Sequence, residues 1–391
     1  MKHLAFLLAV LVPSPARAQE PRGWAAFTQT FDRTADQDSV VGASVVFVRQ
    51  GHALTHHEHG LADRAPGPVQ PVDERTIFHY GSITKTLTAV AIMQLRDRGR
   101  LSLDDRVTSY IPELRQVHDP FGSMDAITIR MLLSHSSGFQ NPTWPYRHYV
   151  SWEPFEPVRW DQLVAMMPYQ ELLFAPGSRF GYSNPAFIYL ARIIEQLSGD
   201  PYQSYIYKNI WVPLGMTRSY FAATPWTLTD QRSNNFTLVK DSAGPEHVVA
   251  NGRDFDPGIT IPNGGWNAPL ADLVTWTAFL TGATRGDAAT ERLYAAVLSR
   301  ASLEEMWHAV VPVGGPAGES MGLSFFLRPL RGVTLVGHTG EQAGFRSFLY
   351  FNPRTAEAVI GVFNTTNDVH ANESAARWQN LLAAAADLIA P

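Results

Sequence analysis

The sequence predicts an α/β protein of the α+β kind. One antiparallel sheet, built from both ends of the chain, is flanked by helices and carries a mostly helical inserted lobe. A β-branched run, Val40 to Val48, places a strand near the N-terminus. Three short strands are expected near the C-terminus, at Val333 to Val336, Gly344 to Phe351 and Ala358 to Phe363. The middle of the chain holds helical pieces broken by Pro and Gly, and strands at both ends with helices between them favour this layered architecture.

The N-terminal elements supply the first half of the sheet. Gly23 to Ala35 has the apolar spacing of an amphipathic helix. Val40 to Val48 then leads through a turn at Gln50-Gly51 into a second strand that runs through Gly60. These two strands predict a hairpin.

The next element is a helix from Ile83 to Arg98, whose apolar positions indicate burial on most faces and which Gly99 closes. Ser82 therefore lies at a helix N-terminus. From Leu101 onward the pattern is helical but interrupted, with a clear helix at Phe187 to Leu197.

The C-terminal third returns to strands, with turns expected at Gly340 and at Asn352-Pro353, and ends in a helix from Glu373 to Leu388. We expect residues 19–391 to form a single domain. Its sheet region spans about 24–80 and 320–391, and its helical lobe spans about 83–280. A cleft between sheet and lobe is the expected active site.

The composition narrows the function classes. The 391 residues are 45% hydrophobic and 17% charged, which is typical of a globular protein with a sizeable core. A net charge of -5 gives no basic field for a phosphate backbone, so a nucleic-acid partner is not expected. The chain has no cysteine, which excludes a thiol nucleophile, a disulfide and a Cys-type metal site.

The first residues predict a signal peptide. Lys2 and His3 precede a short apolar run, Leu4 to Val12, and Ala16-Arg17-Ala18 offers small residues at a cleavage site. We therefore expect residues 1–18 to be removed and the protein to be exported, to the periplasm. The alternative is an uncleaved interfacial anchor. No later stretch reaches the roughly 20 apolar residues of a spanning helix.

Ser82-Ile83-Thr84-Lys85 is the one Ser-x-x-Lys tetrad in the chain. Positions i and i+3 of a helix share a face, so the Lys85 amine can reach the Ser82 hydroxyl. Serine needs a base to become a nucleophile, and a buried lysine with a lowered pKa can be that base. The helix N-terminus suits a developing oxyanion. The alternative is that Ser82 only caps the helix, since chance can supply one such tetrad.

Tyr182 and Asn184 supply the context, in a glycine-rich loop. A tyrosine beside a lysine can share or accept the serine proton, and the Asn184 amide can hold a substrate carbonyl and the lysine together. Tyr207-Lys208-Asn209 and Tyr350-Phe351-Asn352 share the spacing, but the first falls in a helix and the second closes a strand. Only the loop copy can present both side chains to a cleft.

His338-Thr339-Gly340 follows the strand from Val333 to Gly337, at the sheet edge expected to border the cleft. Gly340 allows close approach of a substrate or backbone, and the next N–H, that of Glu341, can complete an oxyanion hole. Taken alone, a histidine in this position is a turn residue.

The three motifs in this order resemble the serine β-lactamase and penicillin-binding superfamily, in the branch of class C β-lactamases, D,D-carboxypeptidases and related esterases. The resemblance covers about Phe27 to Leu388 and includes these landmarks: Phe78 to Ser82, Leu132 to Gly138, Pro213 to Met216 and Gly264 to Trp266.

This resemblance implies a β-lactamase-like fold and acylation followed by hydrolysis, without metal or organic cofactor. By similarity Ser82 is the nucleophile, Lys85 and Tyr182 are the general acid-base pair, and Asn184 binds substrate. The Ser82 and Glu341 N–H groups form the oxyanion hole. Which of Lys85 and Tyr182 takes the proton stays open.

Two departures bear on the substrate. His338 stands where class C β-lactamases carry lysine, so a permanent cation is replaced by a switchable one. Glu341 follows Gly340 and, if it faces the cleft, disfavours a substrate carboxylate, although Arg346 could offset it.

We therefore expect an esterase or a D-amino-acid peptidase of the D,D-carboxypeptidase kind, acting on a small molecule or peptide, ahead of a β-lactamase. A non-catalytic peptidoglycan-binding protein on the same scaffold is the alternative from another class.

Two further clusters have open roles. His57 and His59, in a histidine-rich strand with His52 and His56, share a face compatible with a zinc pair, but a polar outer sheet face also explains them. An aromatic group either walls the substrate site or pins a long loop: Trp144, Tyr146, Tyr149 and Trp152.

Overall fold

A computed structural model describes residues 20–64, 69–139, 157–242, 244–284, 286–314 and 318–391, together with the backbone of a two-residue strand pair, β5 (Tyr146–Arg147) and β6 (Val150–Ser151). The expected signal peptide and the side chains of Trp144, Tyr146, Tyr149 and Trp152 lie outside the described residues. Both interpretations therefore stay predictions.

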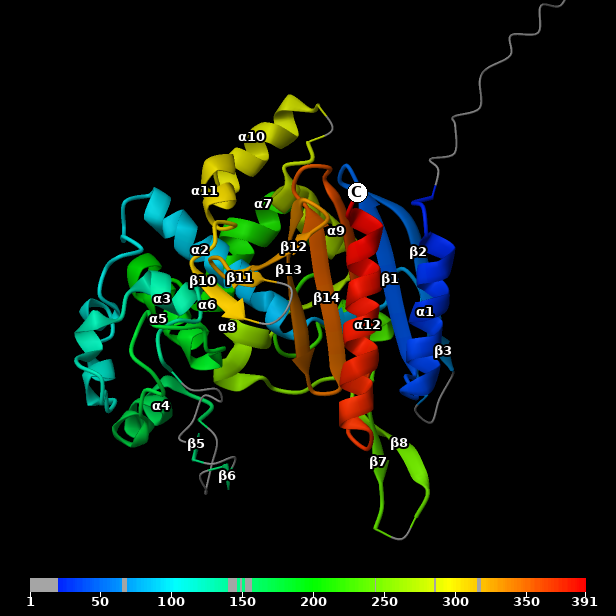
Figure 1. The fold of residues 1–391 in the computed structure, drawn as a ribbon, viewed down its shortest axis with the longest axis horizontal. Helices are drawn as coiled ribbons and strands as arrows, with labels where there is room; N and C mark the ends of the chain where they lie inside the picture. Colours follow the sequence, from blue (N-terminus) through cyan, green and yellow to red (C-terminus); the bar gives the residue numbers. More distant parts are fainter. Residues whose placement is uncertain are drawn as a thin grey trace, which may run out of the picture.

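A nine-stranded antiparallel sheet forms the centre of the molecule (Figure 1). Its order is β10-β11-β12-β13-β14-β15-β1-β2-β3, so strands from the two ends of the chain meet where β15 pairs with β1. This confirms the expected sheet. The strands are β1 (Gly42–Arg49), β2 (His52–Asp63), β3 (Gln70–Pro71), β10 (Val311–Gly314), β11 (Glu319–Met321), β12 (Phe326–Leu330), β13 (Val333–Gln342), β14 (Phe345–Asn352) and β15 (Glu357–Phe363).

Helices cover both faces of this sheet. The terminal helices α1 (Trp24–Gln37) and α12 (Ala371–Ile389) lie against one face, where they enclose an apolar core with Phe47, Leu335 and Phe363. Residues that alternate with these, such as Val336 and Leu349, join a larger core with α2 (Thr84–Asp97) and α9 (Leu270–Thr281) on the other face. Successive side chains of each strand point to opposite faces of the sheet, so strands such as β13 and β14 contribute residues to both cores.

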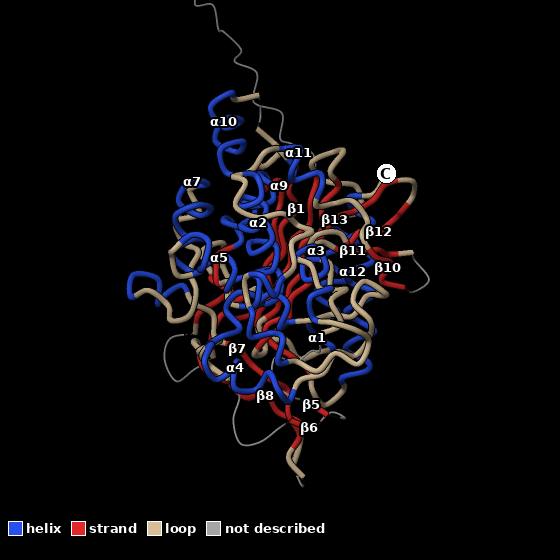
Figure 2. The backbone as a smooth tube through the Cα atoms, turned by 90° about the vertical axis from the view of Figure 1, so that its left-hand side faces the viewer, coloured by secondary structure: helices blue, strands red, loops and turns tan. Residues whose placement is uncertain are grey.

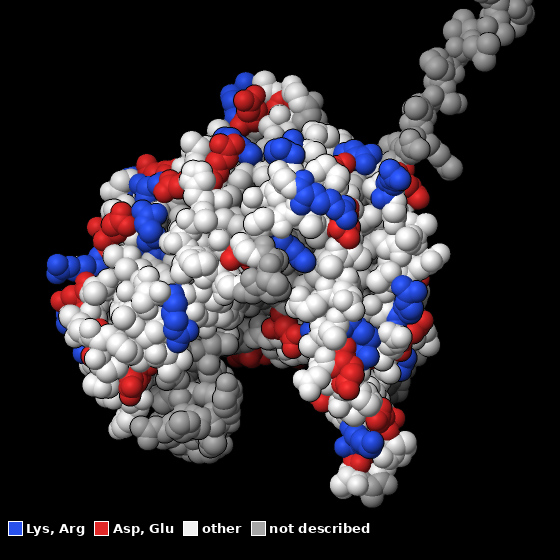
Figure 3. Space-filling view, in the orientation of Figure 1, with Lys and Arg blue, Asp and Glu red and all other residues white. Residues whose placement is uncertain are grey.

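The remaining helices lie in the inserted lobe, which faces the viewer in Figure 2, and in the segment that follows α9. They are α3 (Ile129–Leu133), α4 (Trp160–Met166), α5 (Asn184–Ser198), α6 (Tyr202–Ile206), α7 (Val212–Leu214), α8 (Ile261–Gly264), α10 (Ala288–Val297) and α11 (Arg300–Glu305). Within the described residues no helix has the length and hydropathy needed to cross a bilayer. On the face drawn in Figure 3, basic and acidic side chains are interspersed.

The central helix α2 confirms the burial expected of it. All residues from Thr84 to Leu95 are buried, including three threonines whose hydroxyls find internal partners. Thr84 and Thr86 donate to carbonyls one turn back, and the Thr88 hydroxyl donates to the Pro262 carbonyl in α8. These bonds satisfy the three buried threonine hydroxyls of α2.

The inserted lobe is mostly helical, as expected, but it also contains a hairpin of β7 (Asn235–Lys240) and β8 (Glu246–Gly252), which joins β16 (Thr365–Asn367). In a second small pair, β4 (Ile77–His79), which precedes the Ser82 turn, pairs with β9 (Asn267–Pro269).

The turn expected at Gly340 lies instead at Ala343-Gly344, where both residues have positive φ values of 48° and 85°. Strand β13 therefore continues through His338, Thr339 and Gly340 to Gln342. Gly340 is in the strand because of close packing: a Cβ there would lie 2.0 Å from the Tyr80 carbonyl oxygen. A glycine can be required because another backbone segment packs against it, and in the sequence such a glycine cannot be told from a turn glycine.

Candidate active site

The site is built where the turn before α2 meets strand β13. Gly81–Ile83 form a 3₁₀ turn that leads into α2, so Ser82 lies at the helix N-terminus as expected. A Cβ on Gly340 would come within 3.0 Å of the Ser82 backbone N, and a Cβ on Gly81 within 2.8 Å of the Glu341 backbone N. The two N–H groups expected to form an oxyanion hole therefore meet at one backbone junction.

Strand β13 has a free edge beside this junction. Its pairing with β12 ends at Gly337, whereas its pairing with β14 continues through Gln342. The Ser347 hydroxyl of β14 donates to the Tyr80 carbonyl over 2.9 Å and ties the turn to the sheet. The backbone from His338 to Gln342 is therefore hydrogen-bonded to β14 on one side. On its other side, no strand of the described part of the chain pairs with it.

Ser82 and Lys85 make the contact that the tetrad predicts. The Lys85 Nζ lies 2.8 Å from the Ser82 Oγ, one helical turn away. Lys85 is fully buried, and burial holds the pKa of its amine well below the usual value. The amine therefore favours its neutral form, which is the form that can accept a proton.

Tyr182 lies on the other side of the nucleophile. Its hydroxyl hydrogen-bonds Ser82, and the Lys85 Nζ lies 5.0 Å from the centre of its ring. Burial raises the pKa of the Tyr182 hydroxyl, so this phenol keeps its proton over the physiological range. The structure thus brings Ser82, Lys85 and Tyr182 together as one hydrogen-bonded group.

Asn184 begins α5, directly after the Ser183 N-cap. Its Oδ1 is buried and has no hydrogen-bond partner within the described part of the chain. The second hydrogen bond of Lys85 goes to the main-chain carbonyl of Asn263, over 2.8 Å, rather than to the Asn184 amide. Asn184 therefore keeps an acceptor available. The Asn263 contact has no signature in the sequence, because any residue type supplies a carbonyl.

His338 faces the site, but it is not the switchable cation expected from the sequence. Its ring centre lies 6.3 Å from that of Tyr182, and its Nε2 is buried without a partner among the described residues. Burial and the nearby Lys85 lower the pKa of His338 to about 3. The ring is accordingly neutral at physiological pH, and that expectation is corrected.

Glu341 points away from the site, so its expected effect on a substrate carboxylate is also wrong. Strand alternation places Glu341 and Thr339 on the face toward α12. The Glu341 carboxylate lies 2.9 Å from the Nε of Arg346, whose guanidinium stacks 4.6 Å from the Trp378 ring of α12. Thr339 and Glu341 therefore border the site by their backbone only.

His135 is a site neighbour that the sequence motifs did not single out. It lies in the segment Leu132 to Gly138, and it is completely buried. Its ring stacks on Tyr182 with 4.3 Å between centroids, and its Nδ1 accepts the Ser183 N–H over 3.0 Å. Nothing in the spacing of the chain could predict this contact.

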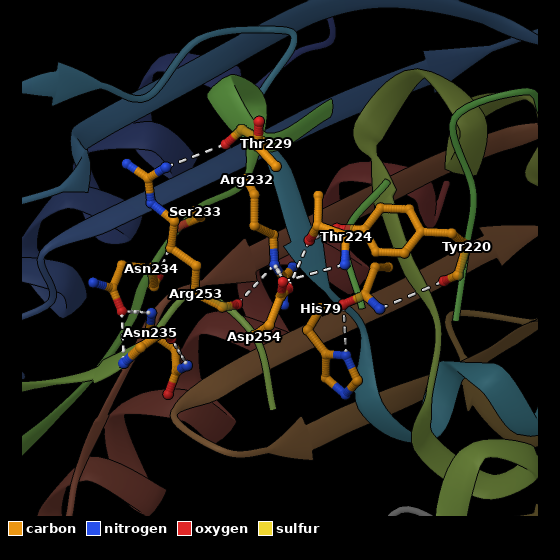
Figure 4. Close-up of polar contacts among 12 residues, drawn as sticks. His79, Tyr220, Thr224, Thr229, Arg232, Ser233, Asn234, Asn235, Arg253 and Asp254 are labelled. Carbon is orange, nitrogen blue, oxygen red and sulfur yellow. Dashed lines mark hydrogen bonds and ion pairs between the residues drawn. The ribbon is translucent and has the colours of Figure 1, made fainter. Parts of the chain in front are cut away.

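His79 heads a second buried polar cluster beside the nucleophile turn (Figure 4). Its Nδ1 lies 3.0 Å from the Asn267 Oδ1, and its Nε2 lies 3.1 Å from the Gln342 Oε1 of β13. Burial and the neighbouring Arg232 lower the pKa of His79 to about 4. The His79 ring thus lies between Asn267 and Gln342 of β13 and links the segment before the nucleophile turn to that strand.

His57 and His59 of β2, considered above as a zinc pair, contact a carboxylate of α1 instead. The His57 Nε2 and His59 Nδ1 both contact the Asp32 Oδ1 of α1, over 2.8 and 3.2 Å. In the described ranges, no group of three or more His, Asp or Glu side chains is arranged to hold a metal ion. These histidines fasten α1 to the outer part of the sheet.

Three comparisons with known proteins agree with this geometry. Esterase EstB of Burkholderia gladioli is 32% identical over 194 residues, which are 48% of this chain and 48% of that protein. The octameric penicillin-binding protein homologue of Pyrococcus abyssi has a TM-score of 0.71 and 27% identity over 92% of this chain and 77% of that one. A D-stereospecific amidohydrolase from Streptomyces sp. has a TM-score of 0.68 and 25% identity over 92% and 98%.

The chain spans about half the length of the curated relatives that it matches. The family model described as Beta-lactamase, by contrast, matches residues 27–385, nearly the whole of the described structure. A β-lactamase-like fold, as the resemblance implied, is thereby confirmed. The chain belongs to the Beta-lactamase family. The esterase and the amidohydrolase among its relatives are serine hydrolases.

Proposed function

We propose that the protein is a serine hydrolase that forms an acyl-enzyme on Ser82 and hydrolyses an ester, amide or peptide bond. The observation that carries the proposal is the position of the Ser82 Oγ, 2.8 Å from a buried Lys85 amine and hydrogen-bonded to Tyr182. Such a group gives a serine both a base and a proton carrier.

In the proposed reaction the neutral Lys85 amine takes the Ser82 proton as Oγ attacks the substrate carbonyl carbon. The carbonyl oxygen becomes an oxyanion, which the Ser82 and Glu341 N–H groups stabilise. When the bond to the leaving group breaks, the leaving group takes the proton from Lys85 through the Tyr182 hydroxyl. Water then attacks the acyl carbon and gives a proton to the same pair. The bond between that carbon and the Ser82 Oγ breaks, the carboxylic acid leaves, and the pair passes the proton to Oγ.

This assignment of roles follows from the two pKa directions. Burial lowers the pKa of the Lys85 amine and raises that of the Tyr182 hydroxyl, so it favours the uncharged form of both groups. An uncharged amine is a base, and an uncharged phenol is a donor. Lys85 is therefore the proposed general base, a choice that the motifs alone left open.

The surroundings of His338 favour an uncharged substrate group. Its neutral ring lies 5.2 Å from that of Phe326, which in turn meets Phe180 at 6.2 Å, and both phenylalanines are half-buried. A neutral aromatic wall suits an ester or amide better than a carboxylate. With an esterase and a D-stereospecific amidohydrolase among the similar proteins, we place these substrates ahead of β-lactams.

The test compares hydrolysis of p-nitrophenyl esters, D-amino-acid amides, D-alanyl peptides and nitrocefin by one preparation. Ser82→Ala should abolish turnover, whereas the control Ser109→Ala, at an exposed position, should leave it unchanged. Nitrocefin hydrolysis far above all the others would reverse the ranking. Binding of muropeptides without turnover of any substrate would favour the non-catalytic scaffold protein instead.

We also propose that the protein is exported by removal of residues 1–18, on the basis of the apolar run and the Ala-Arg-Ala site alone. The mass of the protein recovered from the periplasm of an expressing cell tests this. A chain that begins at Gln19 is expected, and a chain that stays with the membrane and keeps Met1 would favour the interfacial anchor.

A further inference from the structure

His135 packs against the loop that carries Tyr182. The two residues lie far apart in the chain and come from different segments of the helical lobe. Tyr182 lies in the loop that precedes α5, which begins at Asn184. The position of its hydroxyl beside Ser82 therefore depends on what packs against the loop.

His135 forms hydrogen bonds with the backbone on both sides of Tyr182. Its main-chain carbonyl accepts the Gly181 N–H over 2.8 Å, and its Nδ1 accepts the Ser183 N–H over 3.0 Å. Between these two bonds its ring stacks on the Tyr182 ring, with 4.3 Å between centroids and an angle of 26° between the planes. All three contacts act on the tyrosine and its immediate neighbours.

The backbone of His135 is itself in an uncommon conformation. Its φ of 55° lies in the left-handed region, which non-glycine residues seldom adopt. This conformation turns the carbonyl and the ring of the same residue toward one loop. Backbone strain of this kind persists where surrounding structure enforces it, and it gathers near functional sites.

The hydrogen bond from the Ser183 N–H to the His135 Nδ1 requires a neutral imidazole. Because Nδ1 accepts a hydrogen bond, it carries no proton, and the proton lies on Nε2. Nε2 is buried and has no partner among the described residues. Burial, Lys85 and His338 all lower the pKa of His135, so no titration near neutral pH breaks the Ser183 bond.

We propose that His135 is a positioning residue for Tyr182: as an Nδ1-unprotonated imidazole it fixes the phenol beside Ser82 and Lys85 through two backbone bonds and one ring stack. This inference rests on the proposed function, in which Tyr182 carries a proton. The contacts of His135 described above are with Tyr182 and its two neighbours in the chain, so the proposed effect passes through the position of Tyr182.

Two substitutions separate the contacts. His135→Asn keeps an acceptor and suits a positive φ, but it removes the stack. His135→Phe keeps a ring but removes the Nδ1 acceptor. Each should lower kcat on the best ester by about 10²-fold, as a misplaced catalytic group does, while KM stays within about twofold. The loss should lie in the acylation step, measured as the pre-steady-state rate.

Phe139→Leu is the matched control. Phe139 belongs to the same stretch of chain, is also buried, and packs its ring 4.9 Å from that of another buried tyrosine, Tyr189 of α5. A comparable loss of thermal stability with kcat near the wild-type value is expected. Equal losses of kcat in Phe139→Leu and His135→Asn would mean that general packing, not positioning of Tyr182, explains both.

A double-mutant cycle gives the decisive outcome. In a Tyr182→Phe background, His135→Asn should reduce the residual kcat by less than about twofold, because the hydroxyl that it positions is already gone. A further loss of about 10²-fold there would overturn the proposal, because it would show that His135 acts elsewhere. Wild-type kcat in both folded single variants would also overturn it.

Failure of the proposed function is distinguishable from failure of this inference. A fluorophosphonate that labels Ser82 in the wild type but labels both His135 variants equally fast would overturn the positioning role alone. Wild-type protein that hydrolyses esters without any label on Ser82 would overturn the proposed function. Should His135→Asn not fold, the cycle is run with His135→Phe.

Discussion

The two faces of the central sheet solve the problem of burial in different ways. Toward α1 and α12 the core is apolar, and rings meet edge to face: Phe363 lies 4.9 Å from Phe31 and 5.4 Å from Trp378. Toward the helical lobe the same sheet meets buried polar groups, among them Lys85, whose pKa burial has lowered. Both faces carry an apolar core, and the face toward the lobe also holds desolvated groups that can react.

Strand β13 shows the same division within a single element. Its alternation directs His338, Gly340 and Gln342 toward the nucleophile turn and Glu341 toward α12, where Arg346 pairs with it. The ion pair is at the surface of the apolar face and the neutral histidine is inside the polar one. In this strand the ion pair lies where water reaches it, and the neutral histidine lies where it is buried.

The largest expected effect comes from removing the buried amine. Lys85→Met should lower kcat/KM by about 10³-fold or more, because Ser82 loses its base. It should not lower the free energy of unfolding at pH 7, since the folded wild type must keep a lysine neutral that is charged when unfolded. Urea denaturation of both proteins checks this.

The sign of the pH dependence follows from the same lysine. Between its lowered folded pKa and its unfolded value, 10.5, the unfolded chain binds the proton and the folded chain does not. Wild-type stability should therefore rise with pH through this window relative to Lys85→Met. A Lys85→Met protein that is several kcal/mol less stable than wild type at pH 7 would show that Lys85 is a stabilising group.

Gly340→Ala tests the backbone junction itself. The new Cβ would collide with the Tyr80 carbonyl, so β13 must move away from the nucleophile turn. We expect a loss of about 1–3 kcal/mol in the free energy of unfolding and of about 10²-fold in kcat. Gly122→Ala is the control, because a Cβ there meets no atom within 4 Å. Wild-type kcat in Gly340→Ala would contradict the close approach.

Acid should weaken the polar face before the apolar one. His79 and His338, with pKa values lowered from 6.5 to about 4 and about 3, stay neutral in the fold while the unfolded chain takes up protons. The stability present above pH 6.5 should thus be lost as the pH falls toward 4. For each histidine the free energy of unfolding should fall by roughly 1.4 kcal/mol per pH unit across this window.

Denaturant titrations from pH 7 to pH 4 measure this loss. His79→Gln should remove the contribution of one histidine to the slope of the free energy of unfolding against pH. His52→Gln, at an exposed position of β2, is the control. An unchanged slope in His79→Gln would mean that His79 is protonated in the folded protein.

Glu341→Gln should have the smallest effect. The pair with Arg346 involves a carboxylate that is 61% exposed, so its loss costs at most about 1 kcal/mol. The ratio of kcat/KM for a neutral ester to that for a carboxylate-bearing ester should stay within about threefold. A tenfold gain for the anionic ester would place Glu341 at the substrate after all.

Periodicity predicted the parts of the fold that carry a strong repeat. The β1–β2 hairpin, the buried helix α2 and the sheet built from both ends follow from apolar spacing. The extension of β13 did not, because Gly340 in a strand has the local signature of a turn. The β7–β8 hairpin was missed for another reason: β8 is mostly exposed, so its residues do not show the alternation of buried apolar and exposed polar positions that marks a strand.

The site divides in the same manner. Ser82 and Lys85 share a helical turn, so their contact could be predicted from spacing. The carbonyl of Asn263 and the ring of His135 come from distant segments and bear no signature of residue type. The faces of His338 and Glu341 needed the strand register, which the sequence left open.

The most direct measurement of the central claim is the mass of the protein after brief reaction with a fluorophosphonate or a labelled penicillin, followed by peptide mapping. We predict a single adduct, on the peptide that contains Ser82, with formation much slower in Lys85→Met and in Tyr182→Phe. An adduct on another residue, or sustained ester turnover by Ser82→Ala, would contradict the account.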